Sequence, residues 1–183
     1  MPVVIGARPD SGFDDPIGML KDCHRRIERF LGVLFQVCRR AQGRALSNEE
    51  RHAVENALHY FTQSGPRHNE DEEHSVFPRL RASDPAAPTE DVQRLEAEHH
   101  EAAAHHDEVA LLYSKWIADG SLSAQDQSRL LQRTEQLQQL YAEHIRIEEE
   151  LVFPRAAALF NQKILGEIGE EFKARRNSGL RHD

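Results

Sequence analysis

Apolar residues recur every three to four positions along nearly the whole chain, which is the spacing of one face of an α-helix. No segment alternates polar and apolar residues with the two-residue period of a strand. The sequence therefore predicts an all-α fold. Helix-start and helix-stop residues divide the pattern into four long helices, at about 16–40, 48–80, 90–118 and 124–160, and a short C-terminal helix at about 162–176.

Residues that begin, bend and end helices stand at these boundaries. Ser47 and Glu50 have the spacing of a capping box in front of the second helix, and Gly120 ends the third. Pro66 falls inside the second helix, where it lacks the N–H that the helix needs, so we expect a bend there. A proline-containing loop is predicted at Ser83–Thr89, between the second and third helices.

Four helices of similar length joined by short connections predict an antiparallel up-down-up-down bundle. The chain has 183 residues, which is enough for one domain of ordinary size. We therefore expect a single domain over 1–183, with the four-helix bundle at about 16–160 followed by the short helix.

The chain is acidic and polar, which excludes several classes of partner. Its formal net charge is −8, and neither nucleic acid nor an anionic membrane attracts a net acidic surface. No run approaches the roughly 18 apolar residues that cross a bilayer, and the first residues lack the cationic start of a secretory signal. Two cysteines exclude a disulfide scaffold. We expect a cytoplasmic protein that binds neither nucleic acid nor membrane.

The second and fourth predicted helices share a motif. In the twelve residues that begin at His68 and at His144, seven positions are identical, in the pattern His-x-x-x-Glu-Glu-x-x-Val-Phe-Pro-Arg. The first and third helices share a Leu-x-x-x-His pair that ends at His24 and at His99. At heptad spacing these four histidines face inward, and the inward face of the fourth helix is predicted to run on to Leu151. The repeat predicts an approximate two-fold axis.

The repeated motif predicts a metal site inside the bundle. His and Glu four residues apart lie on one helix face, one turn apart. Carboxylates buried there without a partner would carry a heavy desolvation cost, which a bound cation reverses. Two carboxylates suffice to bridge two metal ions while each ion takes two imidazoles, which leaves open coordination positions. Such ligation suits two non-haem iron ions, with manganese and zinc as alternatives. The predicted metal ligands are His24, His68, Glu72, His99, His144 and Glu148.

Nearby polar residues have simpler interpretations. His106 lies seven residues after a predicted ligand, about 10.5 Å further along the helix, so it is too far away to bind the same ion pair. We interpret it as a core or solvent-linked histidine, with a proton relay as the alternative. Tyr141 is interpreted as core packing, with a hydrogen bond to an iron-bound oxygen species as the alternative. Glu73 and Glu149 are expected to be solvated charges, with orientation of the ligands as the alternative.

These motifs resemble those of the hemerythrin-like, or HHE cation-binding, proteins, and look closest to bacterial stand-alone members. The resemblance covers about 17–176 and includes PRHNEDEEHSVFP, EHIRIEEELVFP and LGEIGEEFKARR. It implies a four-helix bundle around a non-haem di-iron centre bridged by two carboxylates. Oxygen-carrying hemerythrins have a fifth histidine where this chain has Ala103, and a bridging aspartate where it has Glu148. The resemblance therefore does not imply reversible oxygen transport.

The preferred function is a di-iron protein that binds, senses or handles oxygen, peroxide or nitric oxide. The expected partner is accordingly a small diatomic or peroxide ligand. One alternative is an enzyme that dismutates peroxide or reduces nitric oxide, or a related iron donor for cluster repair, and no catalytic residue is assigned to it. The other alternative is a structural bundle whose site holds zinc or is vestigial.

Overall fold

The computed structural model describes residues 10–83 and 89–178, and all the regular structure in these ranges is helical, as the all-α prediction required. The predicted loop between the second and third helices falls mostly outside the described residues, as does the N-terminal segment on which the absence of a signal was judged. The elements are α1 (Pro16–Ala41), α2 (Asn48–Gln63), α3 (Gly65–Asp71), η1 (Glu72–Val76), α4 (Phe77–Ser83), α5 (Thr89–Asp119), α6 (Ala124–Ile147), η2 (Glu148–Val152), α7 (Phe153–Leu159) and α8 (Gln162–Ser178), where η1 and η2 are π-helical turns.

Local capping interactions set the helix ends where the sequence predicts them. The backbone N–H of Glu50 donates to the Ser47 hydroxyl at 3.2 Å, and the Ser47 N–H donates back to the Glu50 carboxylate at 2.8 Å, which completes the capping box of α2. At the start of α6 the Ser123 hydroxyl accepts the backbone N–H of Asp126 at 3.1 Å. Gly43 ends the turn after α1 at φ 78°, and its carbonyl accepts the Leu122 N–H at 2.9 Å. The connections α1–α2 and α5–α6 therefore meet at one end of the molecule.

The bend predicted at Pro66 lies between α2 and α3. α2 ends at Gln63 and α3 begins at Gly65, with Pro66 in its first turn, where the missing N–H costs no helical hydrogen bond. The path then continues through η1 into α4, so the predicted second helix consists of four consecutive segments.

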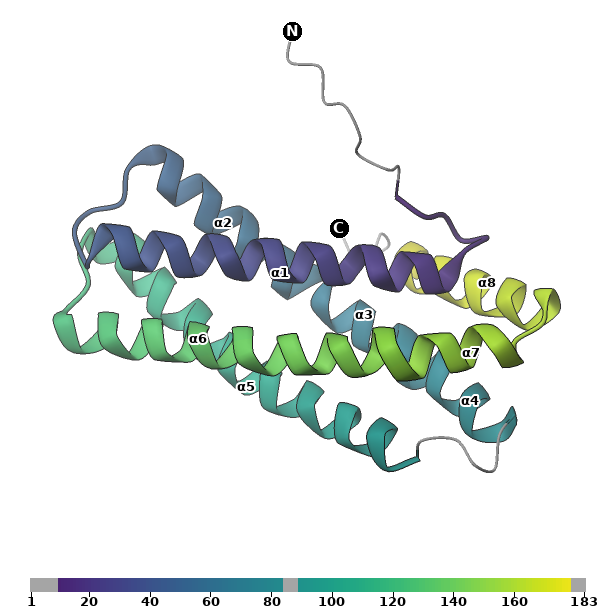
Figure 1. Ribbon diagram of the computed structural model, residues 1–183. Helices are drawn as coiled ribbons and strands as arrows, with labels where there is room; N and C mark the ends of the chain where they lie inside the picture. The colour runs from purple at the N-terminus through teal and green to yellow at the C-terminus, as the bar shows by residue number, and fades with distance from the viewer. Residues whose placement is uncertain (1–9, 84–88, 179–183) are drawn as a thin grey trace, which may run out of the picture.

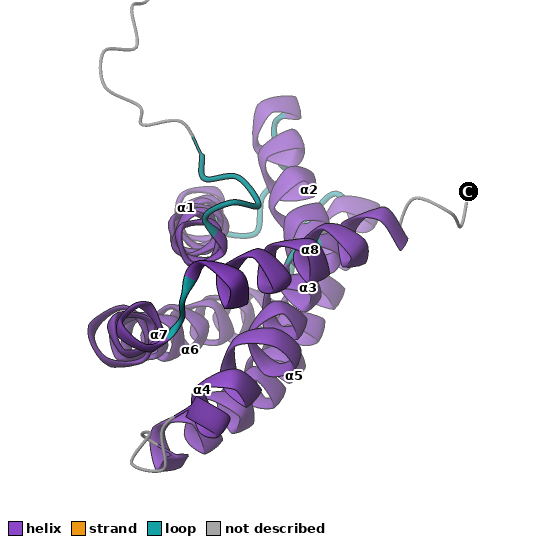
Figure 2. Cartoon of the chain, turned by 90° about the vertical axis from the view of Figure 1, so that its right-hand side faces the viewer, coloured by secondary structure: helices purple, strands orange, loops and turns teal. Residues whose placement is uncertain are grey.

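The long helices pack side by side as a bundle. α1 contacts α2 and α6, while α5 contacts α6 and α2. Figure 2, which looks nearly along α1, shows α1, α2–α3, α5 and α6 at four corners, with α8 lying across one end. α8 contacts α1, α3 and η1, and Figure 1 shows it at the end of the bundle away from the α1–α2 connection. Within the described part of the chain no helix combines the length and apolarity that a bilayer crossing requires.

The core consists of two apolar clusters with a polar layer between them. One cluster surrounds Tyr113 and Trp116, near the α1–α2 connection, and the other surrounds Phe77, Phe153 and Phe172, under α8. Along α1 the second cluster ends at Leu20 and the first begins at Ile27, and along α5 the corresponding residues are Leu95 and Ala102. On α6 the two clusters approach more closely, at Ile145 and Ile147. The six predicted metal ligands are all buried and lie between or beside these cluster ends, so apolar side chains cover them toward both ends of the bundle.

Candidate metal centre

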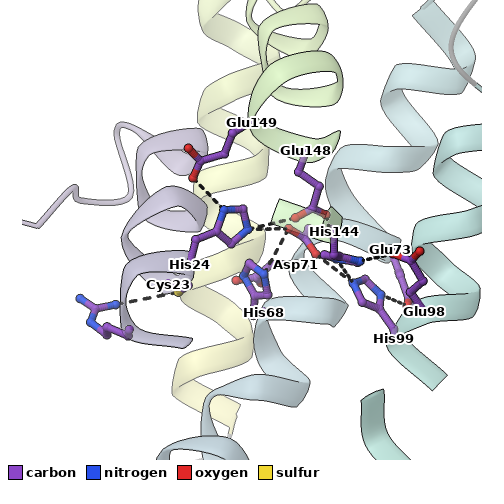
Figure 3. Close-up of polar contacts among 12 residues, drawn as sticks. Cys23, His24, His68, Asp71, Glu73, Glu98, His99, His144, Glu148 and Glu149 are labelled. Atoms are coloured by element: carbon purple, nitrogen blue, oxygen red, sulfur yellow. Dashed lines mark hydrogen bonds and ion pairs between the residues drawn. The ribbon is translucent and has the colours of Figure 1, made fainter. Parts of the chain in front are cut away.

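Four histidines from four helices meet in the polar layer, and Figure 3 shows their rings converging. Every one of these side chains is at most 5% exposed. The Nε2 atoms of His99 and His144 lie 3.2 Å apart, so the rings turn the same edge toward the middle of the bundle. The four residues are His24 on α1, His68 on α3, His99 on α5 and His144 on α6.

The four imidazoles form two pairs, His24 with His68 and His99 with His144. The fully buried carboxylate of Glu72 lies between these pairs. Its Oε1 is 3.4 Å from Nε2 of His68 and 4.0 Å from Nε2 of His24. Its Oε2 is 3.4 Å from Nε2 of His99 on the other side. One carboxylate thus offers a different oxygen to each half of the site.

Glu148, from the second copy of the repeated motif, is equally buried and lies between the same two imidazole pairs. Its Oε2 is 3.0 Å from Nε2 of His24, and its Oε1 is 3.4 Å from Nε2 of His144. The result is two four-residue groups that share both carboxylates, and within each group the donor atoms all lie within 4.8 Å of one another. The groups are His24, His68, Glu72 and Glu148, and Glu72, His99, His144 and Glu148.

Both carboxylates begin a π-helical turn, a feature that the sequence pattern did not predict. The N–H of Phe77 donates to the carbonyl of Glu72, five residues earlier, and Phe153 repeats this with Glu148. A proline follows in both cases and cannot donate to the carbonyl four residues before it. Leu151, predicted to face inward, is 48% exposed, which corrects that prediction. Ser75, its equivalent in η1, is fully buried because α8 packs on η1 and Arg175 of α8 donates to the Ser75 hydroxyl, so this face of the turn is buried where another helix covers it.

Three of the four imidazoles are held at their outer edge by a further carboxylate. A carboxylate only accepts, so Nδ1 of each ring carries a proton, and Nε2 is the nitrogen left to bind a cation. Such outer partners fix the tautomer and the ring orientation of metal-ligating histidines. The Nδ1–oxygen distances are 2.9 Å for His24 with Glu149, 2.6 Å for His99 with Glu73 and 2.9 Å for His144 with Glu98.

The prediction that Glu73 and Glu149 are solvated charges is therefore wrong. Each directly follows a central carboxylate, Glu72 or Glu148, in the repeat, and that equivalence is the signal in the sequence that favoured the orienting alternative. Each orients a histidine of a different helix, His99 for Glu73 and His24 for Glu149. Glu98 has no counterpart in the repeat, and sequence reasoning missed it.

Burial and mutual repulsion drive the pKa values of the central groups apart. Burial, reinforced by the neighbouring Glu148 carboxylate, raises the pKa of Glu72 well above its usual value. Burial also lowers the pKa of His68 well below its usual value. For His24, burial opposes protonation, but the adjacent carboxylates of Glu148 and Glu149 outweigh it and raise the pKa to about 10. In the absence of a cation, protons must fill the site.

The donor set fits metal ions. Among the described residues, both oxygens of Glu72 and of Glu148 are buried without a hydrogen-bond partner, and so is Nε2 of His24. Unsatisfied buried carboxylates are costly, because the interior replaces none of the hydration they lose. One cation in each four-residue group would satisfy these oxygens and the Nε2 atoms together, so the donor set fits two metal ions that share both carboxylates.

Comparison with known proteins agrees with this donor set. Residues 15–156 match the hemerythrin HHE cation binding domain. The chain belongs to this family. A protein of Haemophilus influenzae described as an uncharacterized protein is 29% identical over 164 residues, which cover 90% of this chain and 91% of the relative. Membership of this hemerythrin family supports cation binding but does not identify the metal, for which the chemistry of the donor atoms is the remaining guide.

Two residues beside this hemerythrin-like centre are joined by a hydrogen bond. Nε2 of His106 lies 3.2 Å from the hydroxyl of Tyr141, and the Tyr141 ring packs edge-on against His144. Burial, aided by the neighbouring His105, lowers the pKa of His106 to about 4, so this imidazole is neutral at physiological pH. Burial also raises the pKa of Tyr141 above its usual value. His106 and Tyr141 therefore form a neutral hydrogen-bonded pair, and Tyr141 connects it to His144 of the centre by ring packing.

Metal binding to the metal-free hemerythrin-like site is expected to release a proton from His24. Because its pKa is about 10 in the folded chain, the ring is protonated at pH 7 and must lose that proton to become a ligand. This group alone should therefore raise the apparent zinc affinity about tenfold per pH unit up to pH 10, above which the effect ends. Calorimetric zinc titrations in buffers of different ionisation enthalpy measure the released protons, and a pH-independent affinity between pH 7 and 9 would contradict the assignment.

Removing an outer carboxylate is expected to weaken metal binding without abolishing it. Glu149→Gln keeps the size of the side chain but removes the charge that faces Nδ1 of His24, and such changes typically cost 10–100-fold in metal affinity. Glu150→Gln is the matched control, because Glu150 is exposed and pairs with Arg146 at the surface. Competition with a chelator of known zinc affinity measures both variants. Equal affinities for the two would remove Glu149 from the site.

Proposed function

We propose that this chain holds two non-haem iron ions and that this centre binds, senses or handles oxygen, peroxide or nitric oxide. The observation that carries the proposal is that each buried carboxylate offers one oxygen to each imidazole pair. The proposed ligands are the six residues predicted from the sequence: His24, His68, Glu72, His99, His144 and Glu148.

The nature of the donors favours iron over the alternatives. Each half of the site offers two imidazole nitrogens and two carboxylate oxygens, and no thiolate stands among the donor groups. Mixed nitrogen and oxygen ligation with vacant positions suits non-haem iron, while manganese and zinc remain the alternative occupants. Bound iron supplies redox chemistry and an open coordination position for a diatomic or peroxide ligand. The chain's own part is to hold the donors in place and to turn the Nε2 atoms toward the centre through the carboxylates at Nδ1.

The architecture that we propose for this function is a single domain whose four long helical paths run up-down-up-down. The contacts α1 with α2, α1 with α6 and α5 with α6 support this order, and so does the meeting of the α1–α2 and α5–α6 connections at one end. In such a bundle the two copies of the His-x-x-x-Glu motif approach the centre from facing helices, which is what bridging requires.

Metal analysis combined with optical spectroscopy tests the function. Protein purified aerobically is expected to contain two iron ions per chain and to be coloured, with a spectrum that changes on reduction and again when peroxide or nitric oxide is added. A colourless protein without stoichiometric iron would contradict the proposal. Stoichiometric zinc that resists replacement by ferrous iron would favour the structural alternative instead.

A second candidate, peroxide dismutation, is favoured by the hydrogen-bonded pair of His106 and Tyr141. The reaction converts two hydrogen peroxide molecules into two waters and one oxygen, so it needs no outside reductant, but it needs groups that carry protons. Oxygen evolution by the iron-loaded protein, reduced in the Tyr141→Phe variant with full iron content, would support this function. An iron-loaded protein that evolves no oxygen would exclude it.

A further inference from the structure

A pocket between α2–α3 and α5 runs from the surface to the edge of the metal centre. Its volume is about 420 Å³. Buried side chains form its inner part, among them His99 and Tyr141, and exposed residues such as Ala103 and Asp107 form its rim. It therefore connects solvent with the half of the site that contains His99.

The pocket is far larger than the ligands considered so far. A water molecule takes up about 30 Å³ in the liquid, and oxygen or hydrogen peroxide is of similar order. Pockets that bind organic molecules are typically about 300–1,000 Å³. The space arises because the chain bends at Gly65, where an added Cβ would meet no atom within 4 Å, and because α5 presents Ala103 and Ala110 to it.

The chemistry of the pocket changes from rim to inner end. Leu58, Phe61 and Ala110 make its walls apolar. At the inner end the neutral pair of His106 and Tyr141 offers hydrogen bonds without charge. Such an arrangement matches a ligand with an apolar body and one neutral hydrogen-bonding group.

The charges around the pocket disfavour anions. Glu70, Glu73 and Asp107 line it, and no lysine or arginine stands among its described lining residues. A carboxylate or phosphate ligand would therefore enter against repulsion and find no counterion, whereas an uncharged molecule meets no such barrier.

From these features we infer that the pocket binds a neutral organic hydroperoxide, with the apolar body against Phe61 and the O–OH end toward Tyr141 and the metal centre. The inference deepens the proposed function, on which it rests, by naming an organic peroxide as the ligand class of the same centre. It concerns binding alone, and no bond of the ligand is broken.

The test uses 2-phenyl-2-propanol, the unreactive alcohol that corresponds to an aryl-alkyl hydroperoxide, and the full chain loaded with zinc. Calorimetry or ligand-observed NMR should show saturable binding, while benzoate, an anion of similar size, should bind at least tenfold more weakly. Ala103→Phe fills the pocket from its rim and should weaken alcohol binding at least tenfold. Ala104→Phe is the matched control, because Ala104 is exposed on the same helix outside the pocket and should leave binding unchanged.

A second variant and a second metal keep the test decisive. Thr62→Trp obstructs the pocket from an exposed position on α2, so it tests the same point if Ala103→Phe fails to fold. In cobalt(II)-loaded protein the protons of the bound alcohol should relax faster than in zinc-loaded protein, because the pocket ends at the centre. Absence of binding, binding insensitive to both filling variants, or equal relaxation with the two metals would overturn the inference.

These outcomes are separable from the outcome for the proposed function. A chain that holds two iron ions but does not bind the alcohol keeps the iron function and overturns the pocket inference. A chain that binds the alcohol next to cobalt but never acquires iron supports the pocket and contradicts the iron function.

Discussion

Glu72→Gln is expected to abolish stoichiometric metal binding at both halves of the centre. The metal-free variant is expected to be at least as stable as the metal-free wild-type protein. Glu72 gives one oxygen to each imidazole pair, so its loss removes a donor from both ions together. In the metal-free protein, however, burial raises the pKa of Glu72 well above its usual value, and its oxygens have no hydrogen-bond partner among the residues that the structure describes. A neutral amide of the same shape removes a destabilising group there.

The stability difference appears only when metal is present. An ion at a thousand times its dissociation constant stabilises the native state by about 4 kcal/mol, and for a chain of this size that corresponds to a rise of roughly 10 °C in Tm. Glu72→Gln should lose this rise, whereas Glu70→Gln, on the exposed side of the same helix, should keep it. Thermal unfolding with and without metal, combined with elemental analysis, measures both. A variant that retains two ions would show that Glu72 is not a required ligand. A metal-free variant whose Tm lies well below that of the metal-free wild type would show that Glu72 has a structural role.

The central donors were predictable because they follow from local helix geometry. From a capped start such as Ser47, the helical period places His68 and Glu72 on one face, and the repeat marks the same pair in the fourth helix. The bend at Pro66 does not disturb this, because α3 resumes the same inward face. Periodicity and duplication together bring the six residues to one layer without knowledge of any tertiary contact.

The outer carboxylates were not predictable by the same means, because each acts on a residue far away in the chain. Glu149 bonds to His24, 125 positions earlier, and Glu98 bonds to His144 on the next long helix. On its own helix, a glutamate next to an inward-facing residue has the position of a half-exposed surface charge. Only the packing of neighbouring helices turns it toward a histidine ring.

The π-helical turns escaped prediction for a related reason. Their hydrogen bonds reach back five residues, so the periods of 3.5 or 3.6 that reveal helices no longer hold within them. Leu151 and Ser75 occupy equivalent places in the two turns, yet Leu151 is 48% exposed and Ser75 is fully buried, so the heptad count alone does not decide burial there. The turns begin at Glu72 and Glu148 themselves, so the departure from the α-helical period affects the residues that follow these carboxylates.

The position of α8 depends on ion pairs that the sequence pattern does not reveal. Asp71, fully buried and adjacent to Glu72, accepts hydrogen bonds from Arg175 at 2.7 Å and from Arg176 at 2.8 Å. One turn later Ser75 accepts a further hydrogen bond from Arg175, at 2.6 Å. These contacts connect α8 to the π-helical turn that begins at Glu72, so α8 is expected to hold that turn in place.

Replacing both arginines, in the variant Arg175→Met with Arg176→Met, is expected to lower the free energy of unfolding by about 3–5 kcal/mol, because Asp71 is left buried without a counterion. Adding Asp71→Asn to this variant removes the uncompensated charge and should restore part of the loss. Lys173→Met, a change at an exposed position of α8, should have little effect. Urea unfolding of the metal-free proteins measures these differences, and zinc titration should show weaker binding for the double variant. If the double variant and Lys173→Met unfold alike, or if Asp71→Asn brings no recovery, then α8 is not held by this buried charge, and the backbone at Glu72 must be positioned by the bundle alone.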